Sequence, residues 1–69
     1  METKDLDNRF TYHAPKGDQA SRYELIRSLG GEFAYTINSQ CPDSREKSLA
    51  ITRLEEVVMW VNAAIARNE

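Results

Sequence analysis

The sequence predicts an all-α fold in which an N-terminal arm precedes an antiparallel two-helix hairpin, and three observations support it. Apolar residues recur at steps of three and four along two long segments, which is the spacing of one helix face. A proline lies between these segments and separates them. The chain has only 69 residues, so one hairpin buries little surface and is expected to assemble into a homo-oligomeric helical bundle.

The N-terminal arm is expected to span residues 1–16, which are polar and follow no helical repeat. It contains the stretch RFTYHAPKG, with Phe10, Tyr12 and His13 close together. Two interpretations of the rings stay open from the pattern alone: they pin the arm to the hairpin, or they face a ligand. Bases stack on aromatic rings and guanidinium groups bind phosphate, so Tyr12 and Arg27 would form a nucleotide site if the arm folds back along the first long helix.

The first long helix is predicted over residues 17–40. Gly30 and Gly31 lie inside it, where each glycine costs about 1 kcal/mol relative to alanine. Either the pair breaks or kinks the helix, or the missing side chains let a second helix or a ligand approach closely, which is the interpretation we prefer. The predicted apolar face consists of Tyr23, Ile26, Gly30, Phe33 and Ile37.

The second long helix is predicted over residues 43–68, after Pro42 ends the first. Asp43 is expected to be its N-cap, and Glu46 three residues later fits a capping box. Its apolar seam should pack on the first helix in a heptad-like pattern. The predicted seam consists of Ala50, Leu54, Val57, Val61 and Ala64, widened by Ile51, Val58 and Ile65.

A second apolar edge on this helix is formed by Leu49, Trp60 and Ala63. One partner helix cannot cover the seam and this edge together, so we expect the edge to form an oligomer interface. The alternative is that Trp60 folds under the N-terminal arm of a monomer.

Residues for catalysis or metal binding are few. The only cysteine, Cys41, and the only histidine, His13, cannot form a disulfide or a four-ligand zinc site, and no motif supports them as a catalytic pair. Glu55 and Glu56 fit a solvated helix face. We therefore expect no enzyme activity, metal or cofactor.

Charge and hydropathy limit the kinds of binding partner that this chain is expected to have. The net charge is −2 and the basic residues are dispersed among acidic ones, which disfavours binding to duplex nucleic acid. No apolar run is long enough for a membrane span and the first residues do not resemble a signal peptide, so a cytosolic protein is expected. A local cluster of cations would still bind a small anion.

Three segments carry a resemblance to a known family: FTYHAPKGDQ, YELIR, and the long run CPDSREKSLAITRLEEVVMWVNAAIARN. They resemble the small phage proteins of the second anti-CBASS type, which act as cyclic-oligonucleotide sponges against CBASS immunity. The resemblance extends from about Phe10 to Asn68 and so includes nearly the whole chain. It implies a helical protomer that forms a homohexamer in the host cell cytoplasm and holds cyclic oligonucleotides without cleaving them.

The resemblance also implies residue roles. Cyclic dinucleotides such as cyclic GMP-AMP would bind between protomers, with Tyr12 stacking on a base and Arg27 on a phosphate, and with His13 and Phe10 nearby. Lysine occupies the position of Arg27 in another member, so arginine is a departure that keeps the charge. Arg67 is the candidate for a separate cyclic trinucleotide site. The competing hypothesis is a small helical oligomeric interaction module that inhibits a host protein.

Overall fold

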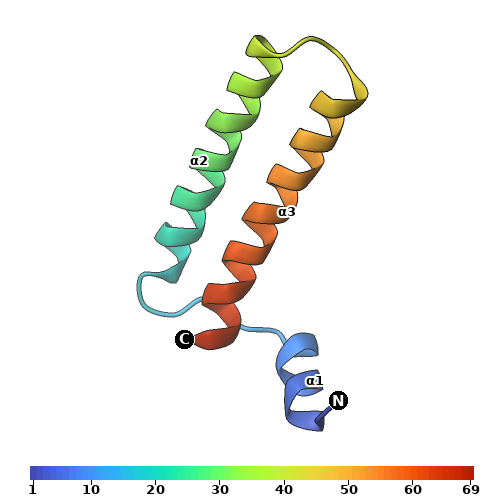
Figure 1. The fold of residues 1–69 in the computed structure, drawn as a ribbon. Coiled ribbons are helices and arrows are strands. Elements are labelled where there is room, and N and C mark those ends of the chain that lie inside the picture. Colours follow the sequence, from blue (N-terminus) through green and yellow to red (C-terminus); the bar gives the residue numbers. More distant parts are fainter.

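The computed structural model of this chain contains three helices and no strands. Helix α1 spans Thr3–Phe10, α2 spans Gln19–Gln40 and α3 spans Arg45–Asn68. Figure 1 shows α2 and α3 as an antiparallel hairpin, with α1 beyond its open end, where α2 begins and α3 ends. The all-helical hairpin predicted from the sequence is therefore confirmed.

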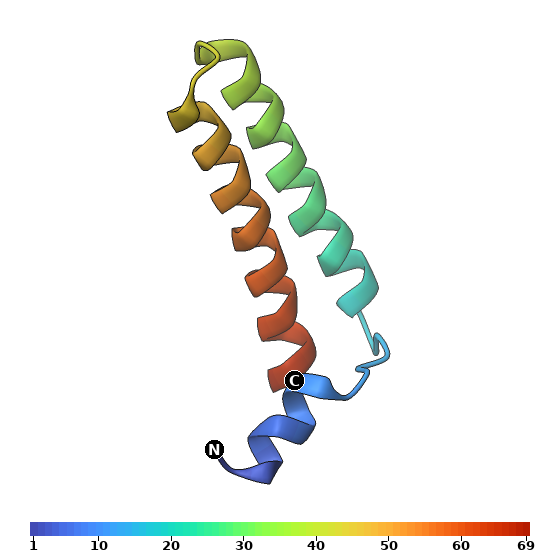
Figure 2. The ribbon, with the colours of Figure 1, turned by 90° about the vertical axis from the view of Figure 1, so that its right-hand side faces the viewer.

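The hairpin is a single layer of helices, as the two perpendicular views in Figures 1 and 2 show. The molecule measures 44 × 30 × 13 Å along its principal axes, and its smallest extent is close to the diameter of one helix, about 10–12 Å. No hydrophobic side chain is fully buried as a result. Helices α2 and α3 pack on each other along one side only, and the rest of their apolar surface is uncovered.

The two long helices approach each other closely at Gly30, which is one of two buried residues in the chain. A Cβ atom at Gly30 would lie 2.5 Å from Cγ2 of Val58 on α3, well inside van der Waals contact. Gly31 has no such neighbour. Helix α2 runs through both glycines without interruption, so the close approach of a second helix is confirmed and the break is not.

The contact face of α3 differs from the predicted seam. Leu54 and Val58 line the grooves on both sides of the hairpin, so they mark the centre of the contact. Ile51, Leu54, Val58 and Ile65 are half-buried, whereas Ala50, Val57, Val61 and Ala64 of the predicted seam are exposed. The four half-buried residues all belong to the predicted seam with its flank, so the contact is centred on the flanking residues Ile51, Val58 and Ile65 together with Leu54, and Val58 meets Gly30 there.

The N-terminal segment is also different from the prediction. Residues 1–16 were expected to be extended, but Thr3–Phe10 forms α1 and only the stretch after it is non-helical. Asp5 in the first turn and Arg9 in the last turn both complement the helix dipole. An isolated helix of 8 residues is marginal in water, so α1 depends on its ties to the rest of the chain.

The start of α3 corrects a further detail. Ser44, not Asp43, is the N-cap, and its Oγ accepts a hydrogen bond from the Lys47 backbone N–H at 3.1 Å. Asp43 instead receives the Lys47 ammonium at 2.8 Å, so the expected capping box with Glu46 does not form. Aspartate and serine are both favourable N-cap residues, and Ser44 is the one that directly precedes the first helical residue, Arg45.

Candidate functional site

A groove of about 410 Å³ lies at the open end of the hairpin, where the end of α1, the following segment, α2 and α3 meet. Three arginines line it, and we call it the basic groove. Its lining residues are Arg9, Thr11, Tyr12, His13, Tyr23, Arg27, Asn62, Ala63, Ala66 and Arg67.

The basic groove concentrates positive charge on an acidic protein. No aspartate or glutamate lines it, although the whole chain carries a net charge of −2. Arg9, Arg27 and Arg67 form no ion pair within the chain, since the four ion pairs all use other cations. Their guanidinium groups are therefore free to bind an anionic ligand, with the forked geometry that suits phosphate.

The structure brings Tyr12, His13 and Arg27 together around the basic groove. The Tyr12 side chain is 82% exposed, so it is not packed against the hairpin and keeps a free aromatic face. Phe10 is 85% exposed and does not line the groove, although the resemblance implied that it lies near the same site. Phe10 is the last residue of α1 and Thr11 is extended, so the chain changes direction between the two rings.

His13 has a structural contact at the site. Its Nε2 lies 2.8 Å from the backbone oxygen of Asn8, and because a carbonyl only accepts, this nitrogen must carry the proton. Asn8 in turn donates from Nδ2 to the backbone oxygen of Arg67 at 3.2 Å. These two bonds tie α1 and the following segment to the last turn of α3, so His13 packs the arm while it also lines the groove.

Arg67 lines the same groove as Tyr12 and Arg27 within one chain. The family resemblance implies a separate trinucleotide site for Arg67. Its backbone oxygen is used by Asn8, but its guanidinium remains unpaired. The groove thus offers three cations to one ligand.

Sequence reasoning missed four polar residues of the groove, Arg9, Thr11, Tyr23 and Asn62, and two of these have unpaired atoms. The Tyr23 hydroxyl and the Asn62 Oδ1 are buried and have no hydrogen-bond partner in the chain. Buried polar atoms are normally paired, so a ligand or water that donates to Asn62 and accepts from Tyr23 would satisfy both. Asn62 interrupts an otherwise apolar run in α3, which was the one available signal for it.

A second groove of about 470 Å³ lies between α2 and α3, next to the basic groove. Arg27 and Asn62 belong to both grooves, and Gly30, Gly31 and Ala34 provide small side chains along the second. The two grooves therefore form one continuous surface with a basic end and a more apolar end.

The predicted interface residues lie on different parts of α3. Trp60 is 64% exposed and Leu49 is exposed as well, so the N-terminal segment does not cover the tryptophan. The alternative in which Trp60 folds under the arm is wrong. Ala63 is half-buried and lines the basic groove.

The remaining candidates for chemistry do not meet. Cys41 follows α2 at the closed end of the hairpin and is exposed, while His13 precedes α2 at the open end. A helix of 22 residues is about 33 Å long, which keeps the two side chains apart. No group of three or more His, Cys, Asp or Glu side chains has the geometry to hold a metal ion. None of the helices is long and apolar enough to cross a membrane.

Fold and site together define a small helical hairpin protein with a basic groove suited to an anionic, base-containing ligand. Comparison with protein families matches residues 1–66 to the Acb2/Tad1 hairpin domain. The chain belongs to this family, which is the anti-CBASS sponge family that its sequence resembles. Its members are of a binding type rather than a catalytic one, and the family implies cyclic oligonucleotide binding in general. No curated protein and no solved structure matches the chain.

Proposed function

We propose that this protein binds and sequesters cyclic oligonucleotide second messengers, and so prevents CBASS effectors from being activated. Its ligands are cyclic dinucleotides such as cyclic GMP-AMP, and also cyclic trinucleotides. The ligand is held without cleavage in the host cell cytoplasm, which supports immune evasion by a phage. Family membership supports the ligand class, and the basic groove supports the site.

The observation that carries this proposal is the position of Tyr12 beside three unpaired arginines. A cyclic oligonucleotide has flat bases joined by singly charged phosphates, so it needs stacking surfaces and cations together. Tyr12 offers a free ring, and Arg9, Arg27 and Arg67 offer forked donors. The unpaired atoms of Tyr23 and Asn62 add a donor and an acceptor for the edge of a base.

Self-association into a homo-oligomer, with a hexamer expected, is part of the proposal. A compact monomer of this mass should expose about 4,400 Å², whereas this chain exposes 5642 Å². The excess includes large apolar side chains on both long helices, among them Leu25, Leu29, Phe33, Tyr35, Val57, Met59 and Trp60. Burying such side chains between protomers would supply the apolar core that the single layer lacks.

Calorimetry with cyclic GMP-AMP tests the site directly. Tyr12→Ala should weaken binding by about 1–3 kcal/mol, or roughly 5- to 140-fold in Kd, because one base loses its stacking partner. Arg27→Ala should cost about 1.5–3 kcal/mol because a charge-assisted bond is lost. Arg53→Ala is a matched control for Arg27→Ala, since Arg53 does not line the groove. Unchanged binding in both groove variants would refute the site.

A thermal-shift panel separates the sponge from the alternative, a small helical oligomeric interaction module that inhibits a host protein. A bound ligand stabilises the folded state by about 2.7 kcal/mol when it is a hundredfold above Kd. We expect cyclic dinucleotides and trinucleotides to raise Tm, whereas the interaction module predicts no shift with any of them. Recovery of intact ligand after proteolysis of the complex should then exclude cleavage, and linearised product would contradict sequestration.

A further inference from the structure

The most buried side chain of this chain is polar. Gln19, the first residue of α2, is 3% exposed, although no hydrophobic residue is buried at all. Its amide oxygen accepts from the Lys16 backbone N–H at 3.1 Å, and its amide nitrogen donates to Glu69 Oε1 at 3.1 Å. Gln19 therefore joins the segment before α2 to the residue that follows α3.

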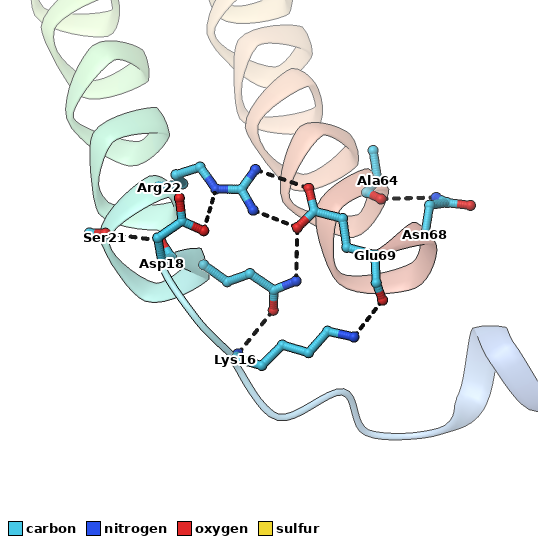
Figure 3. A network of polar contacts seen from close by, with 8 residues as sticks. Lys16, Asp18, Ser21, Arg22, Ala64, Asn68 and Glu69 are labelled. Atoms are coloured by element: carbon cyan, nitrogen blue, oxygen red, sulfur yellow. Dashed lines mark hydrogen bonds and ion pairs between the residues drawn. The ribbon is translucent and has the colours of Figure 1, made fainter.

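Four further hydrogen bonds surround this amide, as Figure 3 shows. Arg22 binds both carboxylate oxygens of Glu69, at 2.9 and 2.5 Å, and Asp18 at 3.2 Å. The Lys16 ammonium donates to the backbone oxygen of Glu69 at 2.6 Å. We call Lys16, Gln19, Arg22 and Glu69 the clasp. The pKa of Glu69 falls to about 2, mainly because Arg22 and then Gln19 donate hydrogen bonds to its carboxylate.

The clasp and the Asn8–Arg67 hydrogen bond hold opposite ends of one segment. At one end, Asn8 donates to the backbone oxygen of Arg67, and at the other, Lys16 donates to that of Glu69. Both acceptors lie at the end of α3, so residues 8–16 form a bracket across it. Tyr12 lies within this bracket, makes no hydrogen bond of its own and is largely exposed. Its position is therefore set by the flanking ties.

The short connection from Tyr12 to the clasp limits its freedom. Pro15 has a fixed φ and restricts the residue before it, and Lys16 follows directly. Gly17 then turns the chain into α2 with a positive φ of 58°, a conformation that glycine adopts without strain. If Lys16 moves relative to α3, the stiff connection through Pro15 therefore moves Tyr12 as well.

We propose that the clasp, centred on Gln19, is a positioning device that holds Tyr12 over the basic groove in its ligand-binding place. This inference rests on the proposed function, because it names what prepares that site. Clasp residues do not line the groove, so they act through Tyr12 rather than on the ligand. Opening the clasp lowers the fraction of chains that are competent to bind, and the apparent Kd rises by the inverse of that fraction.

Gln19→Glu is the sharpest perturbation. This substitution replaces the side-chain NH₂ that donates to Glu69 by an oxygen of similar size, so two carboxylates repel each other. The other side-chain oxygen still accepts from the Lys16 backbone N–H. The reciprocal double variant Gln19→Glu with Glu69→Gln restores a carboxylate–amide pair with the same net charge. Gln40→Glu, at the exposed end of α2, and Glu56→Gln, on α3, are charge-matched controls that lie outside the groove.

Two measurements test the proposal. Amide hydrogen exchange without ligand reports how well residues 8–16 are ordered, and stopped-flow binding of cyclic GMP-AMP gives kon and koff. Gln19→Glu should speed exchange there and lower kon, about fivefold if one chain in five stays competent, with koff unchanged. The double variant should restore both in part, because the amide at position 69 pairs again with position 19 but accepts only one of the two Arg22 hydrogen bonds. Tyr12→Ala should instead raise koff and leave exchange outside its own position unchanged.

Several outcomes would overturn the proposal: exchange in Gln19→Glu that equals that in Gln40→Glu, faster exchange with unchanged kon, or no recovery in the double variant. If circular dichroism shows that Gln19→Glu loses helix, Arg22→Lys replaces it, since lysine keeps the charge but not the fork. If the native chain binds no cyclic nucleotide, the proposed function fails. The exchange data then decide whether the clasp orders residues 8–16.

Discussion

Alanine substitution at two adjacent glycines should differ in its effect on stability. At Gly30 a new Cβ would meet Cγ2 of Val58 at 2.5 Å, a distance that real Cβ contacts essentially never show. Valine has a single stiff χ1 and cannot move one methyl aside without shifting the rest of its side chain. At Gly31 a new Cβ meets nothing within 4 Å. The two sites share the same helix and differ in this one contact.

The magnitudes follow from two opposing contributions. Replacing glycine by alanine inside a helix stabilises it by about 1 kcal/mol at either site. Overpacking at Gly30 opposes this with about 1–3 kcal/mol, because α2 and α3 must separate or Val58 must leave its rotamer. Gly30→Ala should therefore be less stable than Gly31→Ala by about 1–3 kcal/mol. Each 1 kcal/mol corresponds to about 4–8 °C in Tm for a chain of this size.

Thermal and urea unfolding followed by far-UV circular dichroism would measure the difference. All variants should be compared at one protein concentration, because association raises the apparent stability. In a Val58→Ala background the offending methyl is gone, so the two glycine variants should become equally stable. A Gly30→Ala protein as stable as Gly31→Ala, with Val58 intact, would refute the close helix approach.

Three further predictions concern the cap, the clasp and the exposed tryptophan. Ser44→Ala should destabilise the chain by about 1 kcal/mol, since the Lys47 N–H loses its acceptor; an unchanged Tm would contradict this cap. The pKa of Glu69 is lowered from 4.5 to about 2, so its contribution is fully present above pH 4.5 and is lost as pH falls toward 2. Acid titration of stability should show this loss in the native chain and not in Glu69→Gln, and identical profiles would exclude it. Trp60→Ala should weaken self-association in light scattering, and a native chain that is monomeric at high concentration would contradict the proposed assembly.

The long helices were predictable because their apolar spacing and the proline between them act locally. The expected ends, residues 17–40 and 43–68, lie within two residues of Gln19–Gln40 and Arg45–Asn68. The rotation of α3 was not predictable in the same way. It depends on a contact between Gly30 and Val58, which are far apart in sequence; both were placed on apolar faces, but apolar spacing does not say which residues of the two faces meet.

Helix α1 was missed because it has almost no apolar repeat. Leu6 and Phe10 are the only apolar residues in Thr3–Phe10, and no residue of this helix is buried. Its support comes from Asn8 and His13, through polar bonds to and from backbone oxygens. Such bonds depend on the tertiary position of the acceptor, so a periodicity argument does not detect them.

The kinds of group in the candidate site, an aromatic ring and a guanidinium, were predictable, whereas the full set of lining residues was not. Tyr12 and Arg27 are far apart in sequence, and the structure places both at one groove. Phe10 was included because it is close to Tyr12 in the chain, but one extended residue at Thr11 separates their surroundings. Arg9 and Tyr23 were overlooked. An arginine in a polar segment is usually a solvated surface charge, and a tyrosine on an apolar helix face is usually a packing residue.

The exposure of Tyr12 and the polar clasp have a common physical reason. A ring that stacks on a base must keep one face free, so it cannot be fixed by burial in the way that a core aromatic is. The chain has no buried hydrophobic residue near it to serve as an anchor, and its most buried side chain is the amide of Gln19. Directional hydrogen bonds at both ends of residues 8–16 can hold the ring in place without covering it. Packing Tyr12 down as an anchor would stabilise the segment and remove the surface that a base requires.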